Sequence, residues 1–267
     1  MRIASLQPSI SLTLASLGKL DTLCAVTKYC VEALPQLASA NIPVIADSWA
    51  FDRHPASLAD LIASRPDLVI ASVPYTPASL AAILKSGLPT LALAPHTLAD
   101  ILNDTRLIAR QTDSLPQAEI LIHSLQSALT QTRTLTHNTP PQTVYCEEWG
   151  KPLIHSQPWI AELIAAANGR FVGTPGVHTT PETIAALDPD VLLFAWCGAG
   201  DRVPLDRVIA QRNWQHLRAV RNRRVFCIPD EFLNTPSFNL LEGLASISAT
   251  LHPALFPAHP RVKTLLP

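Results

Sequence analysis

The chain has 267 residues, with 20 basic and 21 acidic side chains and a formal net charge of −1. Because there is no surplus of positive charge to neutralise phosphates, nucleic acid and anionic membrane surfaces are excluded as electrostatic partners. Hydrophobic residues make up 48% of the chain and charged residues only 15%, which is the balance of a folded chain and not of a disordered one.

The sequence contains no pattern of an export signal or a membrane span. Met1 to Leu6 run directly into a strand pattern, without a basic head, an apolar stretch and a cleavage site. No apolar run reaches the length of about 18 residues that a membrane span requires. The five cysteines form no CxxC pair, which excludes a zinc site of the finger type. We therefore expect a cytoplasmic protein with reduced thiols; the alternative is a periplasmic protein whose leader has been removed.

Strand patterns and helix patterns alternate along the chain. The expected strands cover residues 2–6, 23–27, 43–46, 67–72, 89–93, 143–147, 190–196 and 224–228. The expected helices between them cover residues 10–17, 55–64, 77–86, 97–111, 158–168, 180–187, 205–211 and 237–250. This alternation predicts parallel sheets with helices on both faces, and near-continuous apolar strands such as 68–71 fit that burial.

One long segment interrupts the alternation. Ser114 and Gln117 form a capping-box pattern, and a single apolar helical face then continues to about Thr136. A helix of this length is about 33 Å long, which is enough to span a domain. The fold class predicted is therefore α/β, with two Rossmann-like lobes built on parallel sheets and joined by a long rigid connecting helix. The boundaries are an N-terminal lobe over 1–100, connecting helices over 101–140 and a C-terminal lobe over 141–267.

The familiar catalytic and phosphate-binding motifs are missing. The sequence has no GxGxxG after its first strand, no GxxxxGK[ST], no GxSxG and no HExxH. The nine histidines are scattered, and His54, His155 and His178 rank first among them because they lie in loops near predicted strand ends. The patterns therefore favour a binding protein over these classes of enzyme.

Large aromatic side chains follow five of the predicted strands. They are Tyr29, Trp49, Trp149, Trp196 and Phe232. In open parallel sheets, ligands bind beyond the carboxyl ends of the strands, so these rings are expected to line one cleft between the two lobes. Such a cleft suits a large, flat, partly apolar ligand. The alternative is that each ring plugs the core of its own lobe, as Trp159 and Trp214 are expected to do from within helix patterns.

Cys197 follows the most apolar strand, in the segment WCGAGD. A thiol at a strand exit is a candidate nucleophile or soft metal ligand, although no partnering base can be assigned to it. The alternative is an inert small residue beside a turn.

Several segments occur in an order and spacing that carry a resemblance. They are RIASLQPS with LASLG near the start, CAVTKYC over 24–30, PDLVIA over 66–71, and the tail from RVF at 224 through NTP at 234 to LHP at 251. Together they resemble the periplasmic-binding-protein-like substrate-binding proteins of cobalamin and ferric-siderophore ABC transporters, and their cobalamin-binding branch in particular. The resemblance covers nearly the whole chain and implies two lobes with a helical backbone between them.

The resemblance also implies roles for individual residues. Tyr29 and Trp49 match aromatics of the N-terminal lobe that contact the corrin, Trp149 matches one of the C-terminal lobe, and the Phe232–Asn234 loop matches a ligand-contacting loop. Family members dock on a permease through an acidic residue from each lobe. Glu182 stands at that place in the C-terminal lobe, whereas the N-terminal lobe has Ala59 there with Asp60 beside it.

We therefore expect a non-enzymatic protein that holds cobalamin or a related corrinoid, with an ABC transporter permease as a second partner. The expected ligand-binding residues are Tyr29, Trp49, Tyr75, Trp149, Trp196, Cys197, Phe232 and Asn234. Three alternatives stay open at this stage. The first is a ferric siderophore held by Arg53, Arg202 and Tyr75. The second is haem with an axial ligand from Cys197, Tyr29 or His178, of which His178 and Cys197 are also the candidate metal ligands. The third is an enzyme that depends on Cys197.

Overall fold

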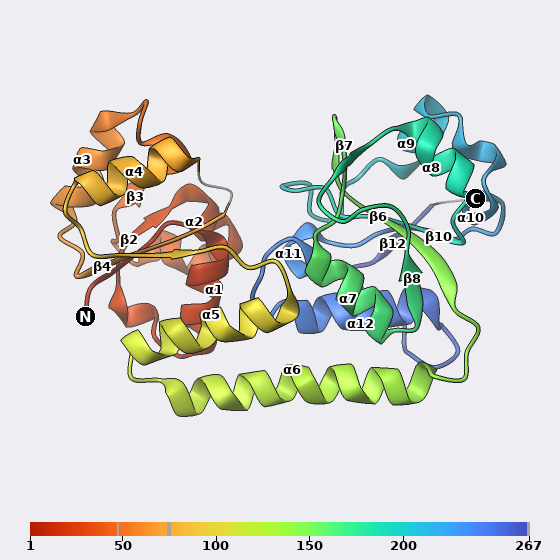
Figure 1. The fold of residues 1–267 in the computed structure, drawn as a ribbon, viewed down its shortest axis with the longest axis horizontal. Helices are drawn as coiled ribbons and strands as arrows, with labels where there is room; N and C mark the ends of the chain where they lie inside the picture. Colours follow the sequence, from red (N-terminus) through yellow and green to blue (C-terminus); the bar gives the residue numbers. More distant parts are fainter. Residues whose placement is uncertain (47, 74–75, 266–267) are drawn as a thin grey trace. The chain divides into compact units, whose positions relative to one another are not determined.

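The computed structural model describes residues 1–46, 48–73 and 76–265, and it divides into two compact units, Met1–Ile122 and His123–Pro267 (Figure 1). Each unit contains one β-sheet and its own helices, which confirms the predicted α/β class with two lobes. The boundary between the units falls inside α6 (Leu115–Thr136), the 22-residue helix that the sequence predicted.

The first unit has a five-stranded, fully parallel sheet. Its strands, in the spatial order β3-β2-β1-β4-β5, are β1 (Ile3–Ser5), β2 (Leu23–Thr27), β3 (Val44–Ile45), β4 (Leu68–Ser72) and β5 (Thr90–Leu93). Its helices are α1 (Pro8–Ser16), α2 (Lys28–Ala33), α3 (Pro55–Ala63), α4 (Pro77–Lys85) and α5 (Leu98–Gln111). Short 3₁₀ turns occupy Leu20–Thr22, Pro35–Ser39 and Ser48–Ala50.

Local sequence accounts for these elements. Helices α1, α3 and α4 each begin with a proline, whose fixed φ suits the first helical position and whose missing N–H costs nothing there. Helix α5 begins with a capping box between Thr97 and Asp100. Helix α2 was not among the expected helices; Thr27 caps it by accepting a hydrogen bond from the Cys30 backbone N–H at 3.3 Å. The sheet packs on Phe51, Leu61 and Ile83 in the core.

The second unit has a mixed sheet, whereas the sequence predicted a parallel one. Its main path is β12-β11-β10-β6-β7-β9, and β8 also pairs with β6. The strands are β6 (Gln142–Gly150), β7 (Leu153–His155), β8 (Gly169–Phe171), β9 (His178–Thr179), β10 (Val191–Phe194), β11 (Val225–Cys227) and β12 (Lys263–Thr264). Strands β7, β9 and β12 pair antiparallel. Sequence periodicity missed β7, β8, β9 and β12 because two or three residues are too few to show alternation.

Helices and short turns complete the second unit. They are α7 (Pro158–Ala166), α8 (Pro181–Leu187), α9 (Leu205–Gln211), the 3₁₀ turn Trp214–His216, α10 (Arg218–Arg221), α11 (Asp230–Leu233) and α12 (Leu240–Leu251). The core of this unit is built around the fully buried rings of Tyr145, Phe194 and Trp214. Within the described part of the chain, no helix is both long and apolar enough to cross a membrane.

Candidate ligand-binding site

The candidate site lies where two neighbouring parallel strands of the second unit end. Strands β6 and β10 pair in register, with Phe194 opposite Glu147. Trp149 therefore stands near the end of β6, and Trp196 follows β10 at the same edge of the sheet. An open cavity of about 370 Å³ lies there and is lined by Trp149, Gly150, Lys151, Trp196, Cys197, Gly198 and Ala199. This is the place where open α/β sheets bind ligands.

Trp149 presents an exposed ring on one side of this cavity. Its side chain belongs to the β6–β7 hairpin and is 43% exposed. The indole Nε1–H donates to the Lys151 carbonyl oxygen at 2.9 Å, which satisfies the only polar group of the ring. The ring face is therefore available for stacking without any loss of hydrogen bonding.

Trp196 is held more tightly than Trp149. Its Nε1–H donates to Glu147 Oε1 at 2.7 Å. A Cβ atom placed on Gly150 would lie 2.5 Å from Cζ2 of this ring, so the two residues touch closely and only glycine fits. Phe194 meets the ring edge to face, with centroids 6.5 Å apart. These contacts fix a partly buried indole as a wall of the cavity.

Cys197 lines the cavity as a neutral thiol. Its Sγ–H donates to Glu148 Oε1 at 3.7 Å, and Asn234 Nδ2 donates to its sulfur at 3.4 Å. Burial raises the pKa of the thiol to about 12, and the nearby carboxylates of Glu148 and Asp230 add to this effect. Burial also raises the pKa of Glu148, although a 2.6 Å hydrogen bond from Gln157 opposes that rise.

The loop after Trp196 is shaped by one carboxylate. Gly198 and Gly200 have φ values of +77° and +59°, in the left-handed region that favours glycine. Asp230, at the start of α11, accepts hydrogen bonds from both of their backbone N–H groups, at 2.8 and 2.7 Å. The floor of the cavity is therefore fixed through its backbone.

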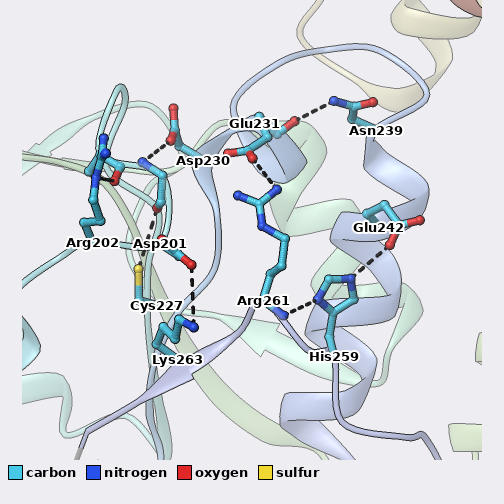
Figure 2. A network of polar contacts seen from close by, with 12 residues as sticks. Asp201, Arg202, Cys227, Asp230, Glu231, Asn239, Glu242, His259, Arg261 and Lys263 are labelled. Atoms are coloured by element: carbon cyan, nitrogen blue, oxygen red, sulfur yellow. Dashed lines mark hydrogen bonds and ion pairs between the residues drawn. The ribbon is translucent and has the colours of Figure 1, made fainter. Parts of the chain in front are cut away.

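The C-terminal segment supports this loop from outside the cavity (Figure 2). Lys263 lies 3.7 Å from the Asp201 carboxylate, and Arg261 forms an ion pair with Glu231 at 2.6 Å. The ring of Phe232 is buried, with only 8% exposed, and the Arg261 guanidinium lies 5.0 Å from its centroid. Phe232, an expected ligand contact, therefore packs against the tail and lies outside the cavity lining. Asn234 also lies outside the cavity lining, but it donates a hydrogen bond to Cys197, which is a lining residue.

The first unit also presents aromatic rings that the sequence singled out. Tyr29 lies on α2 and Trp49 in a 3₁₀ turn, and each is 43% exposed. Each ring carries a cation above it: the Lys28 ammonium lies 4.8 Å from the Tyr29 centroid, and the Arg53 guanidinium 5.6 Å from that of Trp49. Tyr75, a further expected contact, lies outside the described residues.

The remaining predicted residues lie on the surface of their own units. His178 is exposed on β9, Asp60 on α3, and Glu182 in the first turn of α8. The pKa of Glu182 is lowered by hydrogen bonds from its own backbone N–H and from Thr180. Among the residues described, no group of three or more His, Cys, Asp or Glu side chains is placed to hold a metal ion.

The polar residues behind the cavity were not among the predicted site residues. Glu147 and Glu148 are adjacent carboxylates that directly follow the apolar residues 144–146 of the strand, and that pattern was an available signal. Asp230 carried no local signal, and neither did Arg212, which forms an ion pair with Glu147 from 65 residues away.

A family model described as "Periplasmic binding protein" matches residues 3–232. No curated protein sequence matches the chain.

Solved structures share the fold. A periplasmic vitamin B12 binding protein, BtuF of Vibrio cholerae, aligns with a TM-score of 0.75 at 21% identity over 95% of this chain and 97% of its own. A periplasmic heme binding protein from Pseudomonas aeruginosa aligns with a TM-score of 0.82 at 19% identity over 100% and 98%. A Fe³⁺-hydroxamate transport protein from Saccharomonospora viridis aligns with a TM-score of 0.73 at 20% identity over 94% and 92%. At these identities the likeness establishes the fold, and the ligand has to be argued from the site.

Proposed function

The chain belongs to the periplasmic binding protein family, and we propose that it binds a corrinoid such as cobalamin without transforming it. The observation that carries the proposal is the pair of indoles, Trp149 and Trp196, on one open cavity of the second unit. Their flat apolar surfaces suit the face or edge of a macrocycle, which is too wide to be enclosed by about 370 Å³ and has to extend beyond the cavity.

The polar groups near the cavity favour a neutral, amide-bearing macrocycle over an anionic one. Lys151 is the only cationic side chain among the residues that line the cavity. Directly behind this lining, the carboxyl group of Glu148 and the Oδ1 of Asn234 are acceptors close to Cys197, and the buried Oδ1 has no hydrogen-bond partner among the described residues. Such acceptors can form hydrogen bonds with the amide N–H groups of a neutral macrocycle. The carboxylates of haem or of an anionic chelate would instead be bound best by arginine side chains.

Haem or a ferric chelate is the second candidate, because structures with this fold include heme and Fe³⁺-hydroxamate proteins. Arg53 and Arg202 are available on the surface for an anionic ligand. Arg53 already lies over the Trp49 ring, and Arg202 Nε donates to the Ala199 carbonyl oxygen at 3.1 Å. Neither residue lines the cavity of the second unit, which is why we rank this candidate lower.

An enzyme dependent on Cys197 is the least supported reading. A nucleophilic cysteine requires a thiolate, and burial next to Glu148 keeps the pKa of this thiol near 12. The side chains in contact with the sulfur are a carboxyl group and an amide, and neither is a base that lowers the pKa of a thiol.

The experiment that tests the proposal is a parallel titration of the purified protein with aquacobalamin, cobinamide and haemin, followed by absorption spectroscopy and calorimetry. We expect micromolar or tighter binding of the corrinoids with quenched tryptophan fluorescence. Binding of haemin alone would move the function to iron-containing ligands. Failure of all three to bind would refute the proposal.

We extend the proposal to the remaining predicted contacts and to the partner. Tyr29 and Trp49 have faces as exposed as that of Trp149, and we propose them as ligand-binding residues of the first unit. An ABC transporter permease is the proposed partner, with Glu182 and Asp60 as exposed acidic docking residues. Lost capture by the permease in Glu182→Ala, with unchanged ligand affinity, is the expected result.

The similar structures are periplasmic proteins, so the cytoplasmic location expected from the sequence is not supported, and we propose an extracytoplasmic one.

A further inference from the structure

Behind the cavity, the second unit buries a carboxylate that binds four donors. The side chain of Glu147 is fully buried, and Arg212, just beyond the end of α9, is only 9% exposed. Arg212 donates two parallel hydrogen bonds to it, at 2.7 Å to Oε2 and 2.8 Å to Oε1. The Tyr145 hydroxyl donates to Oε2 through a short hydrogen bond, and Trp196 Nε1–H donates to Oε1 at 2.7 Å. Each oxygen therefore has two donors, and the charge is fully compensated.

Stability alone gives little reason for a charged pair at this position. Taking a carboxylate and a guanidinium out of water costs several kcal/mol, and an apolar replacement of the same volume is often equally stable. Here three of the four donors come from groups that are themselves fixed by packing. The Arg212 guanidinium lies 4.8 Å from the ring centroid of Trp214 and 5.8 Å from that of Phe194, and the Tyr145 ring meets both of those rings edge to face.

The fourth donor is the one that reaches the cavity. The Trp196 ring is restrained at Nε1 by Glu147 and at Cζ2 by the backbone of Gly150, and the same residue lines the cavity. An indole free to change rotamer would lose conformational freedom when a ligand stacks on it, which costs affinity. An indole already held in place avoids that cost.

We propose that Glu147 is a positioning residue for ligand binding, with Arg212 and Tyr145 holding its carboxylate so that Trp196 is preset as the stacking wall of the cavity. This inference rests on the proposed function, because it explains how the ligand-binding indole is oriented. It predicts that loss of the carboxylate weakens ligand binding even though Glu147 itself, fully buried, does not touch the ligand.

The test is Glu147→Gln, which keeps the shape of the side chain and removes its charge. The first readout is the ¹H–¹⁵N spectrum of the indole groups in ligand-free protein, in which the chain's five tryptophans give separate signals and Trp196→Phe assigns one of them. We expect the Trp196 indole proton to move upfield and to exchange faster with solvent in Glu147→Gln. The second readout is corrinoid affinity, which we expect to fall about 2- to 10-fold, the cost of immobilising one side chain on binding.

The matched control is Asp190→Asn, which removes the charge of a partly buried carboxylate elsewhere in the same unit. Asp190 accepts hydrogen bonds from Thr143 and forms an ion pair with Arg218. It precedes the first residue of β10, whereas Trp196 follows the last one. This variant is expected to lower thermal stability without moving the Trp196 signal or the affinity. If Glu147→Gln does not fold, Arg212→Lys tests the same contact by removing the two-pronged hydrogen bond and keeping the charge.

The possible outcomes separate this inference from the proposed function. An unmoved Trp196 indole signal in Glu147→Gln would overturn the positioning role, and so would a moved signal with unchanged affinity. Absence of corrinoid binding in the wild-type protein would overturn the proposed function instead, and the role of Glu147 in binding with it. In that case the indole signal would still report whether Glu147 orients Trp196.

Discussion

Replacing Trp149 by alanine removes the most exposed apolar surface of the candidate site. The indole is 43% exposed in the ligand-free structure. If a tryptophan offers about 250 Å² in total, roughly 110 Å² remain for a ligand to cover. At about 25 cal/mol per Å², complete coverage contributes about 2.7 kcal/mol, and half coverage about half of that. We therefore expect Trp149→Ala to weaken corrinoid binding by about 10- to 100-fold.

The assay is calorimetric titration with aquacobalamin and cobinamide. Trp149→Phe keeps an aromatic face and is expected to lose less affinity than Trp149→Ala. Leu187→Ala is the matched control, because this leucine is similarly exposed at the end of α8 and lies outside the cavity lining. The double variant Trp49→Ala with Trp149→Ala is expected to lose more than about 2 kcal/mol of binding free energy. Unchanged affinity in Trp149→Ala would refute the assignment of this indole to the binding surface.

Three further predictions concern the structure without ligand. Gly150→Ala is expected to cost about 1–3 kcal/mol in chemical unfolding, because its Cβ would lie 2.5 Å from the Trp196 ring; unchanged stability would contradict that contact. With a pKa near 12, Cys197 is expected to react with iodoacetamide at pH 8.5 about 10- to 100-fold more slowly than a free thiol, and to speed up as the pH rises towards 12, which peptide mapping measures. Burial, with the nearby Asp100 carboxylate, raises the pKa of Asp104 from 3.8 to about 6, so its stabilising contribution is present below pH 3.8 and lost as the pH rises through 6. Asp104→Asn is therefore expected to stabilise the protein by about 1 kcal/mol at pH 7.5 and to change little at pH 3.5, whereas equal effects at both values would contradict the shift.

The sequence by itself determined the order of the main elements. The eight predicted strands correspond to β1 to β6, β10 and β11, because short apolar or β-branched segments between helix patterns are a strong local signal. The 22-residue α6 was equally clear from its single apolar face. The family resemblance came from the same short segments in the same order, and the family match over residues 3–232 confirms it.

The sequence also located the aromatic side chains of the candidate site. Trp149 and Trp196 were singled out because each follows a predicted strand, and parallel strands present their carboxyl ends at one edge. Their meeting on one cavity required only the pairing of β6 with β10. For Phe232 the same reasoning placed the ring at a strand exit, but it could not foresee that the C-terminal tail would cover it.

Only the tertiary structure decided what holds these rings. The mixed character of the second sheet depends on β7, β9 and β12, which have only two or three residues each and are recognised as strands through their partners in the sheet. Glu147 and Arg212 are 65 residues apart, and nothing local in either segment indicates a shared hydrogen bond. Sequence periodicity reports which face of an element is apolar, whereas hydrogen bonds between distant side chains depend on how the elements pack, and that is settled only when the whole unit is folded.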